Sequence, residues 1–261
     1  MLTANAYWND DPRRSVAMPG DLAPSKPRVD VVLVGSAFAP GGKPAERVTT
    51  RLALETIDKH LDVFCDRTVG PDGAVRGGKP FVRMPISYER AAGGEGTDNP
   101  AGMARGARDA HGHRPLPNVV PPSAGQAFDA EIMPWGYGPI APTWPSRQAR
   151  VGGQGARIAR SWISEPLPSG VGLAFLNFAP RGAWLSALPE QAALTLEGLT
   201  RDAPVFTTAF PASRPRVIVS RGVGHEEPQM RGDAVVIDVN RSIVTLTFRG
   251  HVALKDREEP H

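Results

Sequence analysis

The chain has 261 residues, with 30 Lys and Arg against 27 Asp and Glu, which gives a net charge of +3. This small basic excess forms no block of five or more like charges, which excludes the clustered footprint usual for nucleic-acid binding. A single cysteine excludes an internal disulfide framework, and no apolar run approaches the roughly 20 residues of a membrane-spanning helix.

The N-terminus and the turn-forming residues indicate the class of protein. The first residues lack the layout of a signal peptide, so we expect a cytoplasmic protein. The 28 Gly and 27 Pro make up more than a fifth of the chain, and such residues interrupt helices. The composition therefore predicts short strands and loops, and residues 1–28, which are polar and Pro-rich, are expected to form an extended lead-in.

Alternating apolar residues predict short strands in the first third of the chain. We expect strands at residues 29–38, 48–57, 60–65 and 81–86, with turns at 39–42 and 70–73. Strands 48–57 and 60–65 are predicted to form a hairpin connected by Asp58 and Lys59. Cys65 alternates with Leu61 and Val63, which predicts a buried strand residue in preference to a reactive thiol.

Residues 93–155 show no sustained period and are predicted to form a long irregular loop. The only fair helix candidate is 155–163. Strands are predicted to resume at 171–178, 193–199, 205–210, 216–221, 234–239 and 243–249, with a hairpin loop at Asn240-Arg-Ser242. We therefore predict one all-β domain at 29–250, followed by a frayed tail at 251–261. It should be a sandwich or a pair of antiparallel sheets, with the long loop and at most one short helix.

The patterns that carry catalytic or metal chemistry are weak in this chain. His111 and His113, with Asp109 nearby, lack the further ligands that a metal site needs. The Gly-rich segments at 93–96 and 152–155 carry no Lys-Ser/Thr of a phosphate-binding loop. No Gly-x-Ser-x-Gly segment is present, and Ser and His are too dispersed to nominate a triad. We predict no catalytic residue, no cofactor and no metal.

The aromatic part of the long loop is the best candidate for a binding surface. Trp135, Tyr137 and Trp144, together with Arg147, are residue types that are enriched at binding hot spots. The alternative is that these rings cap one end of a sandwich core. Both interpretations remain open from the residues alone.

One run of residues resembles a known family. The segment Arg83-Met-Pro-Ile-Ser-Tyr-Glu-Arg-Ala-Ala-Gly-Gly94 is similar to the hallmark of the bacterial domain-of-unknown-function family 2169. Further segments match that family in order: 21–42, Asp66-Arg67, Asn99-Pro-Ala-Gly102, Leu116-Pro-Asn118, Trp135-Gly-Tyr-Gly-Pro-Ile140 and Phe175-Leu-Asn-Phe-Ala-Pro180. The resemblance covers about residues 21–250, and its specificity comes from the ordered set.

The resemblance implies an adaptor or chaperone of type VI secretion. Such a protein would bind a toxic effector, often one with a PAAR-type tip domain, and help to load it onto the VgrG spike. It would use an extended loop surface and an open sheet edge, which could add a strand to the client. On this basis, the predicted partner-contacting side chains are Tyr88, Glu89, Arg90, Trp135, Tyr137, Trp144 and Arg147. No nucleic-acid or membrane partner is expected.

The chain also departs from the family pattern. Family members usually have further strands before the opening block, and a missing edge strand would leave unpaired backbone that could dock a partner. They usually have an acidic stretch where this chain has Glu165-Pro-Leu-Pro-Ser-Gly170, which suggests a different choice of partner.

Two other functions remain open. Aromatic platforms and scattered carboxylates would also suit a carbohydrate-active hydrolase or a glycan-binding β-sandwich. A third interpretation is a structural component of the secretion machine.

Overall fold

The structure is a computed structural model that describes residues 5–20, 23, 25–104, 106, 108–122, 134–151, 172–221 and 224–253. The chain is all-β, as predicted, and its described part contains one short α-helix, α1 (Pro145–Gln148). The helix candidate at 155–163 and the end of the tail, 254–261, lie outside the described residues. No helix within the described residues is long and apolar enough to cross a membrane.

The larger of the two main sheets has five strands and is antiparallel throughout. Its order is β13 (Val119–Val120), β6 (Ile57–Phe64), β5 (Arg47–Leu54), β15 (Ala193–Glu197) and β16 (Val205–Ala209). Along β5, exposed residues alternate with buried ones, as the sequence predicts. The β5–β6 hairpin turns three residues earlier than expected. Leu54 pairs with Ile57, Glu55 has a positive φ of 52°, and Asp58 and Lys59 are strand residues instead of a connection.

The second main sheet has four strands and a central parallel pair. Its order is β14 (Trp184–Leu185), β3 (Val29–Val34), β19 (Arg231–Asp238) and β20 (Ile243–Arg249), with β3 and β19 parallel. Every residue of β3 is buried, because both faces of this central strand are covered. The strand expected at 29–38 is broken at Gly35, whose φ of 138° suits glycine. Beyond it, β4 (Ser36–Phe38) pairs with β9 (Arg83–Pro85).

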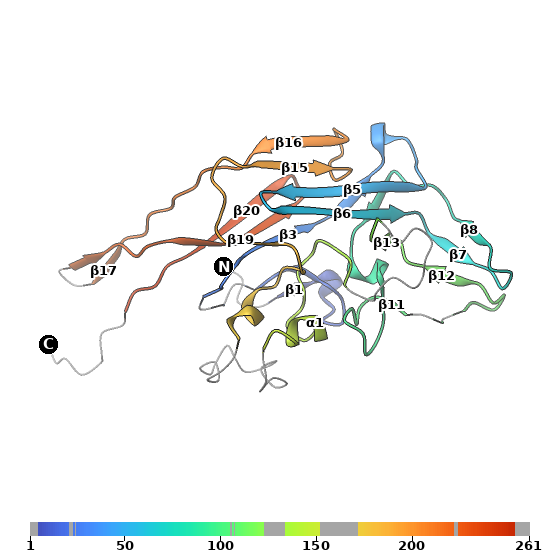
Figure 1. The fold of residues 1–261 in the computed structure, drawn as a ribbon, viewed down its shortest axis with the longest axis horizontal. Coiled ribbons are helices and arrows are strands. Elements are labelled where there is room, and N and C mark those ends of the chain that lie inside the picture. The colour runs from blue at the N-terminus through green and yellow to red at the C-terminus, as the bar shows by residue number, and fades with distance from the viewer. Residues whose placement is uncertain are drawn as a thin grey trace.

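The remaining elements are short. They are β1 (Ala6–Tyr7), β2 (Val16–Met18), β7 (Arg67–Val69), β8 (Val75–Gly77), β10 (Ala92–Gly93), β11 (Met103–Ala104), β12 (Arg114–Leu116), β17 (Val219–Arg221) and β18 (Gly224–Glu226), with 3-10 turns η1 (Trp8–Asp10), η2 (Pro40–Gly42), η3 (Tyr88–Arg90) and η4 (Leu173–Leu176). The expected lead-in at 1–28 thus includes a small β1–β2 hairpin. The β17–β18 ribbon projects from the body of the molecule (Figure 1).

The strand predicted at 171–178 is wrong, because residues 173–176 form η4. Apolar residues alternate in this segment, but its backbone bonds to a side chain instead of to a neighbouring strand. The N–H groups of Phe178 and Ala179 donate to the carboxylate of Asp30. The apolar residues Phe175 and Leu176 are buried beside Val151 in a small separate cluster.

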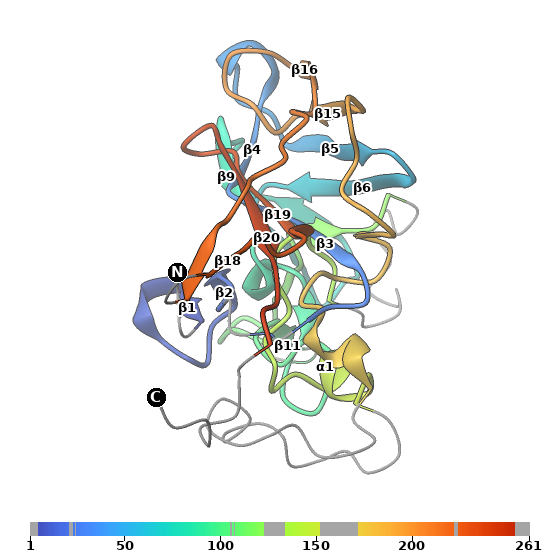
Figure 2. The ribbon, with the colours of Figure 1, turned by 90° about the vertical axis from the view of Figure 1, so that its left-hand side faces the viewer.

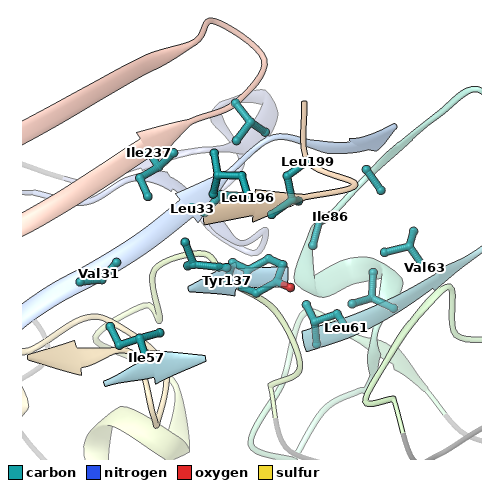
Figure 3. Close-up of a cluster of buried hydrophobic side chains, with 14 of the residues drawn as sticks. Val31, Leu33, Ile57, Leu61, Val63, Ile86, Tyr137, Leu196, Leu199 and Ile237 are labelled. Atoms are coloured by element: carbon teal, nitrogen blue, oxygen red, sulfur yellow. The ribbon is translucent and has the colours of Figure 1, made fainter. Parts of the chain in front are cut away.

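The two main sheets share one hydrophobic core. In both overall views the strands β15, β16 and β5 lie above β19 and β3 (Figures 1 and 2). Side chains from both sheets meet in a single buried cluster, including Leu33 and Ile237 from one sheet and Leu61 and Leu196 from the other (Figure 3). Cys65 belongs to this cluster and is buried, as predicted.

A buried carboxylate links the smaller sheet to the irregular half of the chain. Asp30 of β3 is fully buried. It accepts hydrogen bonds from Lys26 Nζ at 3.0 Å, from Asn177 Nδ2 at 3.0 Å and from the backbone N–H groups of Phe178 and Ala179 at 3.2 and 3.0 Å. A buried charge is tolerated only when it is paired and hydrogen-bonded in this way.

Replacement of Asp30 should destabilise the whole domain. We expect Asp30→Ala to lower the free energy of unfolding by about 3–5 kcal/mol, because it leaves the ammonium of Lys26 buried without its partner. Chemical denaturation measures the change. The control is Glu190→Ala, which breaks an exposed ion pair with Arg214 and should cost no more than about 1 kcal/mol. Equal effects of the two substitutions would contradict this role of Asp30.

Candidate functional site

The aromatic loop is fastened by the tyrosine of η3. The Tyr88 ring meets the Trp144 ring edge-on, with 5.1 Å between centroids, and its hydroxyl donates to the carbonyl of Gly138 at 2.6 Å. A Cβ on Gly136 would lie 2.6 Å from the Tyr88 ring, so only glycine fits there without a shift. The loop therefore runs directly across the face of a buried ring.

The next aromatic side chain of the loop lies in the main core. Tyr137 is 1% exposed and lies among aliphatic side chains of both sheets (Figure 3). Its hydroxyl is 3.0 Å from Thr50 Oγ1 and donates to the carbonyl of Lys59 at 3.2 Å, while its own carbonyl accepts from the N–H of Leu33. Burial raises the pKa of the Tyr137 hydroxyl, so this group stays a neutral donor.

Two arginines hold the segment around α1. Arg147 is buried, and its guanidinium donates to the carbonyls of Phe175 at 2.8 Å and Ile140 at 2.9 Å. Burial lowers the pKa of Arg147 to about 10, which still leaves it charged at neutral pH. Arg150 donates to the carbonyls of Asn177 and Ala179 at 2.7 and 3.1 Å. These bonds satisfy carbonyls that no regular strand or helix would satisfy.

The two charged residues of η3 bind other parts of the chain. Glu89 accepts hydrogen bonds from the backbone N–H of Ser15 at 2.7 Å and from the Ser15 hydroxyl at 2.8 and 2.9 Å. Burial by itself would raise the pKa of Glu89, but these hydrogen bonds lower it overall. Arg90 donates to Asp66 at 3.3 Å and to Asn118 at 3.0 Å. Both side chains are half-buried.

The structure therefore divides the seven side chains predicted to contact a partner. Tyr88, Tyr137, Trp144 and Arg147 are buried, so in this structure they support the loop and do not face a partner. Of the three rings in the core-capping alternative, Tyr137 lies in the main core and Trp135 packs against it, whereas Trp144 lies with Tyr88 in a separate cluster. A hot-spot composition cannot separate the two roles, because large aromatic rings and arginine also fill and fasten interiors. Trp135 is only partly buried and lines an open cleft.

This cleft, which we call the tryptophan cleft, has a volume of about 690 Å³. It is lined by Asp58, Lys59, Asp98, Pro134, Trp135, Ile140, Ser146, Ala149, Arg150, Pro180, Arg181, Gly182 and Trp184. Two indole rings supply apolar surface, and Arg150 lies over the ring of Trp184 at 4.7 Å. Lys59, Arg150 and Arg181 supply positive charge. The carboxylate of Asp58 is already paired with Arg51 at 2.7 Å. The cleft thus suits an apolar group with an acidic neighbour.

Nothing in the sequence pattern groups these lining residues. Trp184 is distant along the chain from Trp135, and Lys59 was expected in a turn. The packing of the two main sheets brings them together, because β6 and β14 lie in different sheets around one core. Burial lowers the pKa of the Lys59 amine to about 8, which makes this lysine chemically distinct.

The other candidate sites have less support for binding a ligand or a metal ion. In the described residues no group of three or more His, Cys, Asp or Glu side chains could hold a metal ion. The rings of His111 and His113 are 6.3 Å apart, and Asp109 caps their loop through backbone hydrogen bonds. A second cleft, of about 610 Å³, lies at the base of the β17–β18 ribbon. Among the residues at that base, Glu190 pairs with Arg214 and Glu227 with Arg216.

The comparisons with known proteins identify one family. A family model described as "Uncharacterized protein conserved in bacteria (DUF2169)" matches residues 1–249. The match includes the residues before position 21, which the motif resemblance did not cover. No curated protein and no solved structure gives a match.

A matched pair of glycine substitutions tests how the loop is held. Gly136→Ala should lower the free energy of unfolding by about 1–3 kcal/mol, because its methyl group would overlap the buried Tyr88 ring. Gly138→Ala should be close to neutral, because its Cβ would make an ordinary 3.5 Å contact with the same ring. Denaturant titration of both variants checks this. A neutral Gly136→Ala would show that the ring does not confine the loop.

The amine of Lys59 should titrate well below an ordinary lysine. Its rate of acetylation should rise with a midpoint near pH 8, because only the neutral amine reacts and burial disfavours the charged form. Peptide mass spectrometry after brief labelling across pH 6–11 follows each lysine separately. Exposed Lys43 is the control lysine in the same molecule. Identical profiles for the two lysines would contradict the prediction.

Proposed function

This chain belongs to the bacterial family DUF2169, and from that membership we propose that it is an adaptor or chaperone for a type VI secretion effector. It would bind the effector in the cytoplasm before export, cover part of its apolar surface and help to load it onto the VgrG spike through a PAAR-type tip. In this proposal the protein is a binding protein without catalytic residues of its own.

The observation that supports this proposal is the tryptophan cleft. Trp135, Trp184 and Arg181 are residue types that dominate binding energy at protein interfaces, and they meet at a concave surface. Hydrogen bonds of the buried residues Tyr88, Tyr137 and Arg147 hold the loop that lines the cleft in place. The loop therefore loses little conformational freedom when a partner binds. A preorganised apolar cleft with basic groups at its margin is suited to grip an apolar segment that carries an acidic residue.

A second candidate function shares this cleft. Two tryptophan rings could also stack on a sugar, as in a carbohydrate-active hydrolase or a glycan-binding protein. Hydrolysis would need a pair of free carboxyl groups across the scissile bond. Of the two aspartates in the cleft, Asp58 is occupied by Arg51 and His60. Glycan-array binding and a hydrolysis screen separate the two functions, because an adaptor should give no signal in either.

The test of the proposal is recovery of the effector from native cells. Tagged protein should copurify an effector that mass spectrometry identifies, and Trp135→Ala should reduce its recovery roughly tenfold, as expected for a hot-spot residue. Trp8→Ala is the matched control, because Trp8 is an exposed tryptophan of η1 that does not line the cleft. Unchanged recovery with folded Trp135→Ala would remove the cleft as the binding site. A failure of the wild type to recover any secreted effector would remove the proposed function.

A further inference from the structure

Within the described residues, β16 is the outer strand of the larger sheet, and no described strand pairs with its outer edge. All five of its residues, Val-Phe-Thr-Thr-Ala, are exposed, and none is charged. Of the nine large apolar side chains that are well exposed in the described part of the chain, six lie between positions 205 and 244, and Val205 and Phe206 belong to β16. Figure 1 shows β16 at the margin of its sheet, with β15 on one side only.

The register of β16 shows which backbone groups face outward. The N–H of Phe210 donates to the carbonyl of Ala192, and the N–H of Gly198 donates to the carbonyl of Pro204. In an antiparallel pair such bonded positions alternate, so the even-numbered residues 204–210 bond to β15. Thr207 is a non-bonded position, and its hydroxyl is accordingly 3.2 Å from that of Thr195. The N–H and C=O groups of Val205, Thr207 and Ala209 therefore point away from the sheet.

This edge lacks the usual protection. Native edge strands are commonly blunted by a charged side chain, an internal proline or a bulge. β16 has no charge, no internal proline and a continuous register with β15. Prolines stand only outside it, at positions 204 and 211, where they limit the strand to a short defined length. An edge of this kind is suited to pair with one further strand.

We propose that a second copy of this chain pairs with β16, antiparallel and across a two-fold axis through Thr207. In this register Thr207 faces Thr207 of the second copy, and Val205 faces Ala209 in both directions. All three outward-facing residues then exchange backbone hydrogen bonds with their partners. Any other two-fold register leaves at least one of them unpaired.

The sizes of the β16 side chains suit antiparallel pairing of the strand with a second copy of itself. The large residues Val205 and Phe206 occupy the first half of the strand and the small residues Thr208 and Ala209 the second. Antiparallel self-pairing places each large side chain opposite a small one, and threonine opposite threonine, which is a favourable cross-strand pair. A two-fold interface also closes on itself, so it consumes both exposed edges and stops at a dimer.

The pairing also covers the exposed core face at this edge. Phe206 pairs with Leu196, which is buried in the main core, so its side chain continues the core face of the sheet although it is 42% exposed. The second copy would set its Thr208 beside this ring. Because a five-residue ladder is a small interface, we expect dissociation in the micromolar range. An effector strand at the same edge is the main competing occupant.

Mass measurement in solution tests the pairing without any effector. Wild type should change from one to two chains per particle as concentration rises through the micromolar range in sedimentation velocity. Thr207→Lys should remain monomeric, because it places two ammonium groups opposite each other at the axis. The control is Thr245→Lys, the same change on exposed Thr245 of β20, an edge strand of the second main sheet, which should dimerise like wild type. Thermal unfolding confirms that both variants are folded.

Cross-linking gives a second measurement. A bonded antiparallel pair has Cα atoms about 5.5 Å apart, within disulfide range, so Thr207→Cys should form a disulfide-linked dimer on mild oxidation. Thr245→Cys should not, and the native Cys65 is buried. A wild type that stays monomeric, assemblies larger than dimers, or equal behaviour of the 207 and 245 variants would overturn the proposal. A monomeric wild type that loses its effector on Thr207→Lys would assign the edge to an effector strand instead.

Discussion

The burial of one carboxylate in the middle of a β-sheet constrains the irregular half of this protein. Asp30 has no access to water, so each of its lone pairs needs a donor from the chain. Lys26 supplies one, lies 3.8 Å from the Phe178 ring centroid and is itself buried. The others come from residues 177–179, which must therefore leave any strand-like pairing and turn toward β3. The 3-10 turn η4 just before them follows from this demand.

The same constraint extends to the candidate site. Once residues 177–179 are bound to Asp30, the carbonyls of Phe175, Asn177 and Ala179 need other donors, and Arg147 and Arg150 provide them. These arginines lie in and beside α1, which follows the aromatic loop. A chain of hydrogen bonds thus runs from a buried acid in the sheet to the wall of the tryptophan cleft. The hydrogen bonds that satisfy the buried polar groups therefore also help to place Arg150 in the cleft beside Trp135.

The contrast between local apolar patterns and long-range hydrogen bonds explains which features could be predicted from the sequence. Alternation identifies β5 and β15, each of which lays one face on the core, and the apolar pattern also identifies β6, β19, β20 and buried Cys65. Alternation also suggests a strand at 171–178, where the apolar residues fill a pocket of their own and a distant acid decides the backbone. It cannot show that Tyr88 and Trp144 face inward, since the same rings suit a core or an interface. Nor can it show that β16 is an edge, because order within a sheet depends on long-range pairing.

The cleft and the free edge lie on different parts of the molecule, which has a consequence for how they can be used. Lys59 of the cleft is on β6, and β5 and β15 stand between β6 and β16. At the usual spacing between strands this separates the two by about 14 Å of sheet. A strand added to β16 therefore extends the sheet away from the cleft and leaves Trp135 accessible. If the effector binds in the tryptophan cleft, as proposed, the dimer and the effector use different surfaces. A dimer would then present two clefts and could hold two effector chains at once.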